Sequence, residues 1–157
     1  MKIKLLQLGK TNDEDLIKGI ARYEKRLSLY ASFLCETIPA LKDTSSLSPA
    51  QIKQKEGELL LHKFKNDDYV ILLDEKGKSF TSVAFARHIE QLQNHSTRQL
   101  VFVVGGAFGF SEAVYNRAQM KLSLSEMTFS HQLIRLIFME QLYRAFTILN
   151  NHPYHNT

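Results

Sequence analysis

Three glycines gather at the point where an apolar run gives way to the start of a helix. The segment Gly105-Gly106-Ala107-Phe108-Gly109-Phe110 follows the apolar run 100–104 and precedes Ser111, a good helix N-cap. Glycine lets the backbone approach a ligand closely and take a positive φ, and the next helix offers free N–H groups. The segment therefore suits a pocket for part of a nucleotide. A tight structural turn is the alternative interpretation, because the lysine and hydroxyl of a phosphate-cradling loop are missing.

A second segment, 122–130, combines serines with larger apolar residues. Its sequence, LSLSEMTFS, predicts a strand end that passes into a polar turn before the last helix. Such a segment can supply backbone hydrogen bonds, and Met127 and Phe129 an apolar slot for an adenine-sized ring. Helix capping by Thr128 or Ser130 is the competing interpretation. A third loop, 74–78 after Leu73, carries charges that are more typical of a solvated turn.

The last helix, expected over 131–150, is apolar around nearly its whole circumference. One contact with a sheet cannot bury such a helix, so we expect a second copy of the chain to cover the spare face. Glu140 and Arg144 have the spacing of a helical ion pair. The tail His152-Pro153-Tyr154-His155 is rich in aromatic and imidazole groups. No metal is expected there, because two histidines without a carboxylate or cysteine make a poor site.

The length and composition indicate one globular domain over residues 1–157. The chain is 44% hydrophobic and 23% charged, which excludes a disordered or collagen-like protein. Cys35 is the only cysteine, so no intrachain disulfide can form and a reducing compartment is indicated. The start, MKIKLLQLGK, has only a very short apolar stretch. We therefore expect a soluble, cytoplasmic protein.

The charge leans weakly toward polyanionic partners. Twenty basic against sixteen acidic residues give a net charge of +4, and no polybasic tail is present. Any surface for nucleic acid must therefore be assembled by folding. Lys18, Arg22, Lys25 and Arg26 recur on the outer side of the first helix, where they can grip RNA phosphates or form an ordinary solvated face.

Apolar runs of strand length alternate with segments of helical period along the whole chain. Strands are expected at 3–8, 33–38, 69–73, 100–104 and 122–124, and helices at 13–30, 48–64, 81–94, 111–118 and 131–150. Five such alternations predict an α/β fold, a mostly parallel sheet with helices on both faces. Ligands of such sheets bind beyond the carboxyl ends of the strands, so chemistry should be sought in the three loops described above.

Seven motifs follow one another in an order that is more specific than any one of them. They are MKIKLLQLGK at the start, RYEKRL at 22–27, Gly105-Gly106-x-x-Gly109, LSLS with Met127-Thr128, HQLIR at 131–135, EQLYRA at 140–145 and HPYH at 152–155. Together they resemble the RlmH family of SPOUT-class methyltransferases over the whole chain. The resemblance implies methyl transfer from S-adenosylmethionine to N3 of a pseudouridine in 23S ribosomal RNA. It also implies a homodimer and a C-terminal trefoil knot, which local periodicity cannot reveal.

The resemblance also implies where the methyl donor binds. In the family the donor lies in the knot, and the matching positions here are Leu73, Gly105, Leu124, Ser125, Glu126, Met127, Thr128 and Phe129. These positions fall in the three strand-end loops already singled out. Phe108 departs from the pattern, because the family usually has a polar residue there.

The chemistry of methyl transfer suggests roles for the tail. Displacement at a sulfonium needs the nucleophile and the methyl carbon aligned about 3 Å apart, and needs neither a metal nor a covalent intermediate. The N3 imide must lose its proton, and a nearby cation favours the resulting anion. His155, Tyr154 and Arg144 are the expected catalytic residues for base contact and proton handling, and which of them acts as the base is left open. The substrate can be free RNA, the large subunit or the assembled 70S ribosome.

A non-catalytic RNA- or ribosome-binding module is the alternative hypothesis, in which the glycine segment is only a turn. Binding of S-adenosylmethionine separates the two hypotheses. A nucleotide-binding hydrolase is disfavoured, because the sequence lacks both a phosphate-binding lysine and an evident pair of metal-binding carboxylates.

Overall fold

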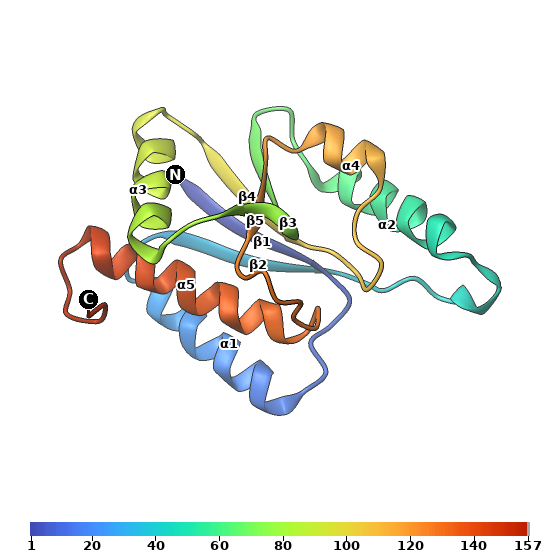
Figure 1. The fold of residues 1–157 in the computed structure, drawn as a ribbon, viewed down its shortest axis with the longest axis horizontal. Helices are drawn as coiled ribbons and strands as arrows, with labels where there is room; N and C mark the ends of the chain where they lie inside the picture. Colours follow the sequence, from blue (N-terminus) through green and yellow to red (C-terminus); the bar gives the residue numbers. More distant parts are fainter. Residues whose placement is uncertain (157) are drawn as a thin grey trace.

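Five strands form one parallel sheet in the computed structural model, which describes residues 1–156 (Figure 1). The elements are β1 (Lys2–Leu8), α1 (Glu14–Leu27), β2 (Ser32–Ile38), a 3-10 turn (Thr44–Ser46), α2 (Pro49–Lys63), β3 (Asp68–Ser79), α3 (Ser82–Asn94), β4 (Gln99–Val104), α4 (Glu112–Arg117), β5 (Met120–Ser123) and α5 (Leu133–Leu149). The sheet order is β2-β1-β4-β3-β5, and every neighbouring pair is parallel. The predicted α/β class and parallel sheet are confirmed.

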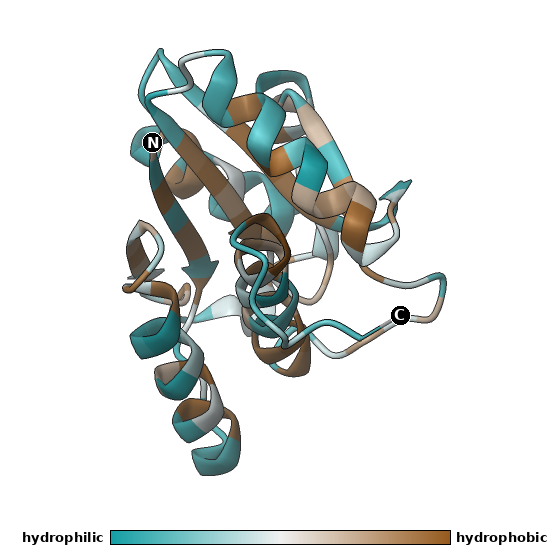
Figure 2. Cartoon of the chain, turned by 90° about the vertical axis from the view of Figure 1, so that its left-hand side faces the viewer, coloured by the Kyte–Doolittle hydropathy of each residue, from teal (hydrophilic) through white to brown (hydrophobic). Residues whose placement is uncertain are grey.

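Alternate side chains of the strands feed two separate cores. Leu5 and Phe102 belong to the core under α1, α3 and α5, whereas Leu6 and Val103 belong to the core under α2 and α4. This alternation follows from the two-residue period of a strand. Figure 2 shows largely hydrophobic strands and helices of mixed character. The helices therefore cover both faces of the sheet, as predicted.

Side-chain caps begin four of the helices where the sequence predicted. Asp13 accepts hydrogen bonds from the first turn of α1, and Ser48 and Gln51 form a capping box at α2. Thr81 and Ser111 cap α3 and α4 in the same way.

Strand β3 is longer than predicted. The expected strand ended at Leu73 in a charged turn, but β3 resumes pairing with β5 at Lys78 after an irregularity. A Cβ at Gly77 would lie 2.5 Å from the Lys121 carbonyl carbon, so only glycine allows this close approach to β5. The predicted end of the strand at Leu73 was therefore wrong, whereas Glu75, Lys76 and Lys78 are exposed, as expected of a solvated segment.

Two helices differ from their predicted bounds. Helix α1 ends at Leu27 rather than Tyr30, because the N–H groups of Leu29 and Tyr30 bond to the carbonyls only three residues back, those of Arg26 and Leu27, in a tighter turn. Helix α5 begins at Leu133 rather than His131, and the Ser130 hydroxyl accepts a hydrogen bond from the Leu133 N–H.

Helix α5 packs against α1 and α3 as well as the sheet. These neighbours bury Phe138, Met139 and Leu142, so the apolar circumference is largely covered within the chain. Leu133 nevertheless remains 38% exposed, and Ile137 is only half-buried.

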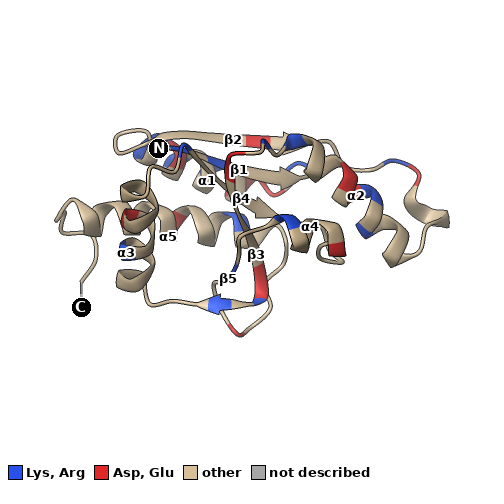
Figure 3. Cartoon of the chain, turned by 90° about the horizontal axis from the view of Figure 1, so that it is seen from above, with Lys and Arg blue, Asp and Glu red and all other residues tan. Residues whose placement is uncertain are grey.

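Charged residues of both signs are interspersed over the sheet and the helices (Figure 3). Within residues 1–156, no helix has the length and apolar character needed to cross a membrane.

Candidate functional site

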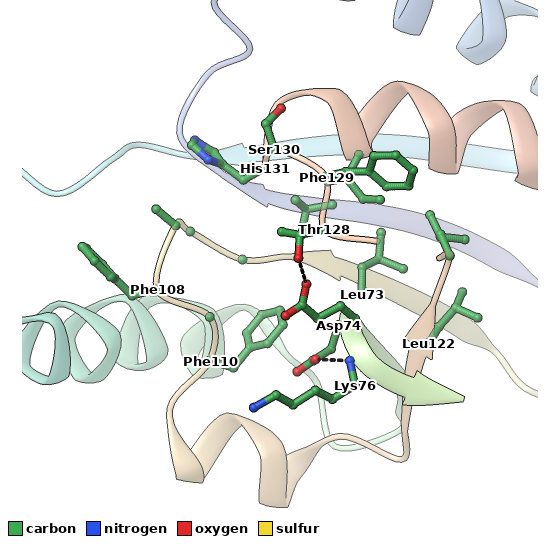
Figure 4. A pocket seen from close by; sticks show the side chains of 18 of the residues that line it. Leu73, Asp74, Lys76, Phe108, Phe110, Leu122, Thr128, Phe129, Ser130 and His131 are labelled. Carbon is green, nitrogen blue, oxygen red and sulfur yellow. Dashed lines mark hydrogen bonds between the residues drawn. The ribbon is translucent and has the colours of Figure 1, made fainter. Parts of the chain in front are cut away.

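A cavity of about 520 Å³ opens beyond the carboxyl ends of β3, β4 and β5 (Figure 4). Three segments build its wall: 73–76 after the first half of β3, the glycine segment 104–110, and the segment 122–134 that joins β5 to α5. The three loops singled out in the sequence therefore meet in one place. A cavity of this size accommodates a molecule as large as a nucleoside derivative.

Seven of the eight predicted donor-binding residues line this cavity. They are Leu73, Gly105, Leu124, Ser125, Met127, Thr128 and Phe129. Glu126 is exposed and does not line it.

The glycine segment needs its glycines for two different physical reasons. Gly109 has a φ of +84°, and its N–H bonds to the Gly106 carbonyl at 3.2 Å, which closes a tight turn. Gly105 has no positive φ, but a Cβ there would lie 2.9 Å from the buried Phe110 ring. Gly105 therefore allows the backbone to pack closely against Phe110 beside the cavity, whereas Gly109 is the residue that adopts the left-handed conformation.

Behind the glycine segment stands a carboxylate that sequence reasoning missed. Glu56 of α2 lies so close that a Cβ at Gly106 would come within 2.5 Å of its Oε2 atom. Burial raises the pKa of Glu56. Its position on a helix remote in sequence left no local signal that it would meet this loop.

Polar groups on one wall of the cavity are tied together by hydrogen bonds. Asp74 accepts hydrogen bonds from the Tyr115 hydroxyl and from the Lys76 N–H, the latter at 2.8 Å. Burial, with a further contribution from Asp74, raises the pKa of Tyr115 to about 12. The phenol therefore stays protonated near neutral pH and continues to donate to Asp74.

The segment after β5 is held in shape by its own hydroxyl groups. Ser123 donates to the Ser125 carbonyl at 2.8 Å, and the Ser125 hydroxyl accepts from the Met127 N–H at 2.9 Å. Thr128 reaches across the cavity and donates to Glu75 (Figure 4). The capping interpretation of this segment is right for Ser130, which accepts from the Leu133 N–H, and wrong for Thr128.

A buried arginine anchors the end of this segment to the sheet. Arg135 is fully buried and donates to the carbonyls of Leu8 at 2.7 Å and Gly9 at 2.9 Å, and to the Thr11 hydroxyl at 3.0 Å. Burial lowers its pKa. Gln132 adds bonds to the same loop after β1, so the beginning of α5 is fixed beside the cavity.

The three predicted catalytic residues come together at the other end of α5. Together with Tyr23 and Glu140 they form what we call the tail cluster, namely Tyr23, Glu140, Arg144, Tyr154 and His155. Tyr154 donates to Glu140 at 3.0 Å, and its hydroxyl lies 3.3 Å from that of Tyr23. The Arg144 guanidinium carbon stands 4.7 Å from the centre of the Tyr154 ring.

The surroundings of Tyr154 and Arg144 in the tail cluster shift the pKa values of both side chains. Burial, followed by the hydrogen bonds of Tyr23 and Glu140, raises the pKa of Tyr154 far above its ordinary value. The hydrogen bond to Glu140 likewise raises the pKa of Arg144. In this arrangement Tyr154 is a phenol and Arg144 a cation.

Within one chain the cavity and the tail cluster lie apart. Ile134, near the beginning of α5, lines the cavity, whereas Arg144 lies near its end. Ten positions separate these two residues, which corresponds to about 15 Å along the helix axis. None of the tail-cluster residues lines the cavity.

A parallel α/β sheet with a cavity at its strand ends is typical of proteins that bind nucleotide-like ligands. Comparison with known sequences identifies the family. A family model described as "Predicted SPOUT methyltransferase" matches residues 1–155, and the chain belongs to this family. The chain is 54% identical over 156 residues to "Ribosomal RNA large subunit methyltransferase H" of Parabacteroides distasonis and 53% identical to the protein of the same name from Flavobacterium johnsoniae. Each alignment covers 99% of both chains.

A solved structure with little sequence similarity shares the fold. A probable methylase family protein from Haemophilus influenzae superimposes with a TM-score of 0.56 at 14% identity, covering 99% of this chain and 70% of that one. The resemblance to the SPOUT methyltransferases, which the ordered motifs indicated, is thus confirmed.

Proposed function

We propose that the chain transfers a methyl group from S-adenosylmethionine to N3 of a pseudouridine in 23S ribosomal RNA. The observation that carries the proposal is the convergence of Leu73, Gly105, residues 124–125 and residues 127–129 on one strand-end cavity. The names of relatives that are more than half identical support the ribosomal RNA of the large subunit as the substrate.

The cavity fits the methyl donor in size and chemistry. Leu73, Leu122 and Phe129 offer apolar contacts to the adenine, and the volume of about 520 Å³ suits a nucleoside that carries an amino acid. Asp74 adds a carboxylate beside the cavity for a donor that bears positive charge. When bound, S-adenosylmethionine supplies an electrophilic methyl group on a sulfonium.

The chain itself supplies positioning and charge. The donor cavity holds the methyl donor and excludes water, while the tail cluster meets the target base. Arg144 stabilises negative charge on the deprotonated imide, and the Tyr154 ring, whose hydroxyl donates to Glu140, can stack on the target base. His155 stands within 3.3 Å of Arg144, where it can contact the base or handle its proton.

Two copies are needed to bring the cavity and the tail cluster together. Leu133, Ile137, Glu140 and Arg144 follow one another at helical spacing on the side of α5 that is incompletely buried. A symmetric contact through this side, with the two helices antiparallel, places the tail cluster of one copy beside the cavity of the other. The proposed enzyme is therefore a homodimer.

Residues 1–157 form a single domain in this proposal, and a C-terminal trefoil knot encloses the donor. The knot agrees with the way Arg135 and Gln132 tie the beginning of α5 to the loop after β1. Family membership is its main support.

The substrate in this proposal is the large subunit or the assembled ribosome, and the enzyme acts in the cytoplasm. Lys18, Arg22 and Lys25 are exposed on α1 and available for RNA phosphates, whereas Arg26 packs over the rings of Tyr23 and Tyr143. The non-catalytic RNA-binding module stays the alternative.

Two measurements test the proposal. Calorimetry with S-adenosylmethionine should show binding to the purified protein, and mapping of ribosomal RNA from a deletion strain should show the loss of one methylated pseudouridine that the cloned gene restores. A protein that binds ribosomes without binding the donor, together with unchanged methylation in the deletion strain, would establish the binding module instead.

A further inference from the structure

Glu140 is the only carboxylate of the tail cluster, and it holds both side chains assigned to the target base. Its Oε1 atom accepts hydrogen bonds from Arg144 Nε at 3.1 Å, from Arg144 Nη2 and from the Tyr154 hydroxyl at 3.0 Å. Gln141 Nε2 donates to the other oxygen at 2.9 Å. One acceptor therefore fixes two residues that are ten positions apart in the chain.

The same carboxylate is itself held from neighbouring elements. Ser82 of α3 donates to Gln141 at 2.9 Å, and the Tyr154 hydroxyl lies 3.3 Å from Tyr23 of α1. The network thus joins α1, α3, α5 and the tail. A simple ion pair between residues four apart on a helix would involve only Glu140 and Arg144. It would not explain why Glu140 also accepts a hydrogen bond from Tyr154.

The network also decides how Arg144 meets His155. Because Glu140 occupies Nε and Nη2 of the guanidinium, Nη1 is the nitrogen left to face His155 Nδ1, at 3.3 Å. A guanidinium has no acceptor, so Nδ1 accepts and the ring proton of a neutral His155 lies on Nε2. Glu140 thereby orients all three residues of the proposed catalytic set.

We propose that Glu140 is a positioning residue for methyl transfer: it holds Arg144 and Tyr154, and through Arg144 also His155, in the arrangement that meets the target base. This inference rests on the proposed function. Glu140 does not contact the methyl donor and is not required for donor binding. Within one chain its side chain is about as exposed as that of Arg144, at 22% against 24%.

The test compares Glu140→Gln with the unmodified dimer acting on ribosomes from the deletion strain. We expect kcat to fall roughly 10- to 100-fold, the kinetic equivalent of one or two charge-assisted hydrogen bonds. Donor affinity and oligomeric state should not change. Glu36→Gln is the matched control, because Glu36 pairs with Lys4 and Lys63 on the opposite part of the sheet and should leave kcat unchanged.

A second readout does not depend on turnover. The Glu140 carboxylate is one cause of the raised pKa of Tyr154, so Glu140→Gln should shift the ionisation of that phenol to lower pH. The absorbance of tyrosinate, compared with the same titration of Tyr154→Phe, isolates this phenol from the other tyrosines. Glu36→Gln should leave the titration as it is in the unmodified protein.

A double-mutant cycle makes the outcome decisive. If Glu140 acts through its partners, Glu140→Gln should reduce kcat much less in a chain that already carries Arg144→Lys and Tyr154→Phe. A full additional loss in that background, unchanged kcat in Glu140→Gln alone, or joint loss of donor binding and dimerisation would each overturn the inference. An unmodified protein that binds the donor but never methylates ribosomes would instead overturn the proposed function, and the inference with it.

Discussion

The donor cavity and the tail cluster are built from different parts of the polypeptide. The cavity is lined by strand ends and loops, where close backbone packing at Gly105 and a positive φ at Gly109 determine its shape. The tail cluster consists of long side chains on helices and the tail, ordered by hydrogen bonds to one carboxylate. The two regions share no residue, so we expect that each can be changed without altering the other.

The largest effect should come from removing the end of the tail. Truncation after Pro153 deletes Tyr154 and His155 and should reduce methyl transfer about 1,000-fold, because groups that contact the reacting base are lost. Donor affinity, measured by calorimetry, should stay the same. Truncation after His155 is the control and should retain activity. Normal turnover by the shorter dimer would disprove the catalytic role, and loss of donor binding together with dimerisation would indicate that the tail only packs.

A substitution in the cavity should instead weaken donor binding directly. Gly105→Val places a branched side chain against the Phe110 ring, 2.9 Å from the new Cβ, and should weaken donor binding about 100-fold by distorting the loop. Circular dichroism should show that the fold survives. Ala113→Val, on an exposed position of α4, is the matched control. Unchanged affinity in a folded Gly105→Val protein would remove this loop from the donor site.

A charge on the incompletely buried side of α5 should disrupt the proposed dimer, and so separate the cavity of one copy from the tail cluster of the other. Ile137→Glu puts a carboxylate into the proposed dimer contact and should raise the dissociation constant of the dimer about 30-fold or more, since an unpaired charge is costly to bury. Sedimentation should show monomers that have lost methyl transfer. Leu34→Glu, at a position 55% exposed on β2, should stay dimeric. An unmodified protein that is monomeric at micromolar concentration would contradict the dimer.

The smallest effect should come from the basic face of α1. Lys18→Gln and Arg22→Gln should each weaken binding to ribosomal RNA about two- to threefold and lower its dependence on salt by about one phosphate contact. Donor binding and dimerisation should not respond. Filter binding at several salt concentrations measures the effect, with Lys53→Gln on α2 as the control. Equal salt dependence in all three variants would assign α1 to an ordinary solvated face.

Much of the fold was predictable because the relevant signals are local. Ser111 was recognised as a cap beside an apolar run, and the helices expected from residues 13 and 48 are capped by Asp13 and Ser48. The loops that line the cavity were recognised for a related reason: residues that directly follow apolar runs must gather at one edge of a parallel sheet. Glu56 and Tyr115 were missed because helices remote from β3 carry them to the cavity and its glycine loop.

The sequence by itself determined the alternation of strands and helices, the places where loops follow strand ends, and, through its ordered motifs, the family. Only the tertiary structure decided that β3 resumes beside β5 across Gly77, and that Glu140 gathers Arg144 and Tyr154 into one network. The physical reason is the range of the interactions. Hydrophobic periodicity and helix caps act over a few residues, whereas close backbone approach and shared hydrogen-bond acceptors depend on segments that meet only after the chain has folded.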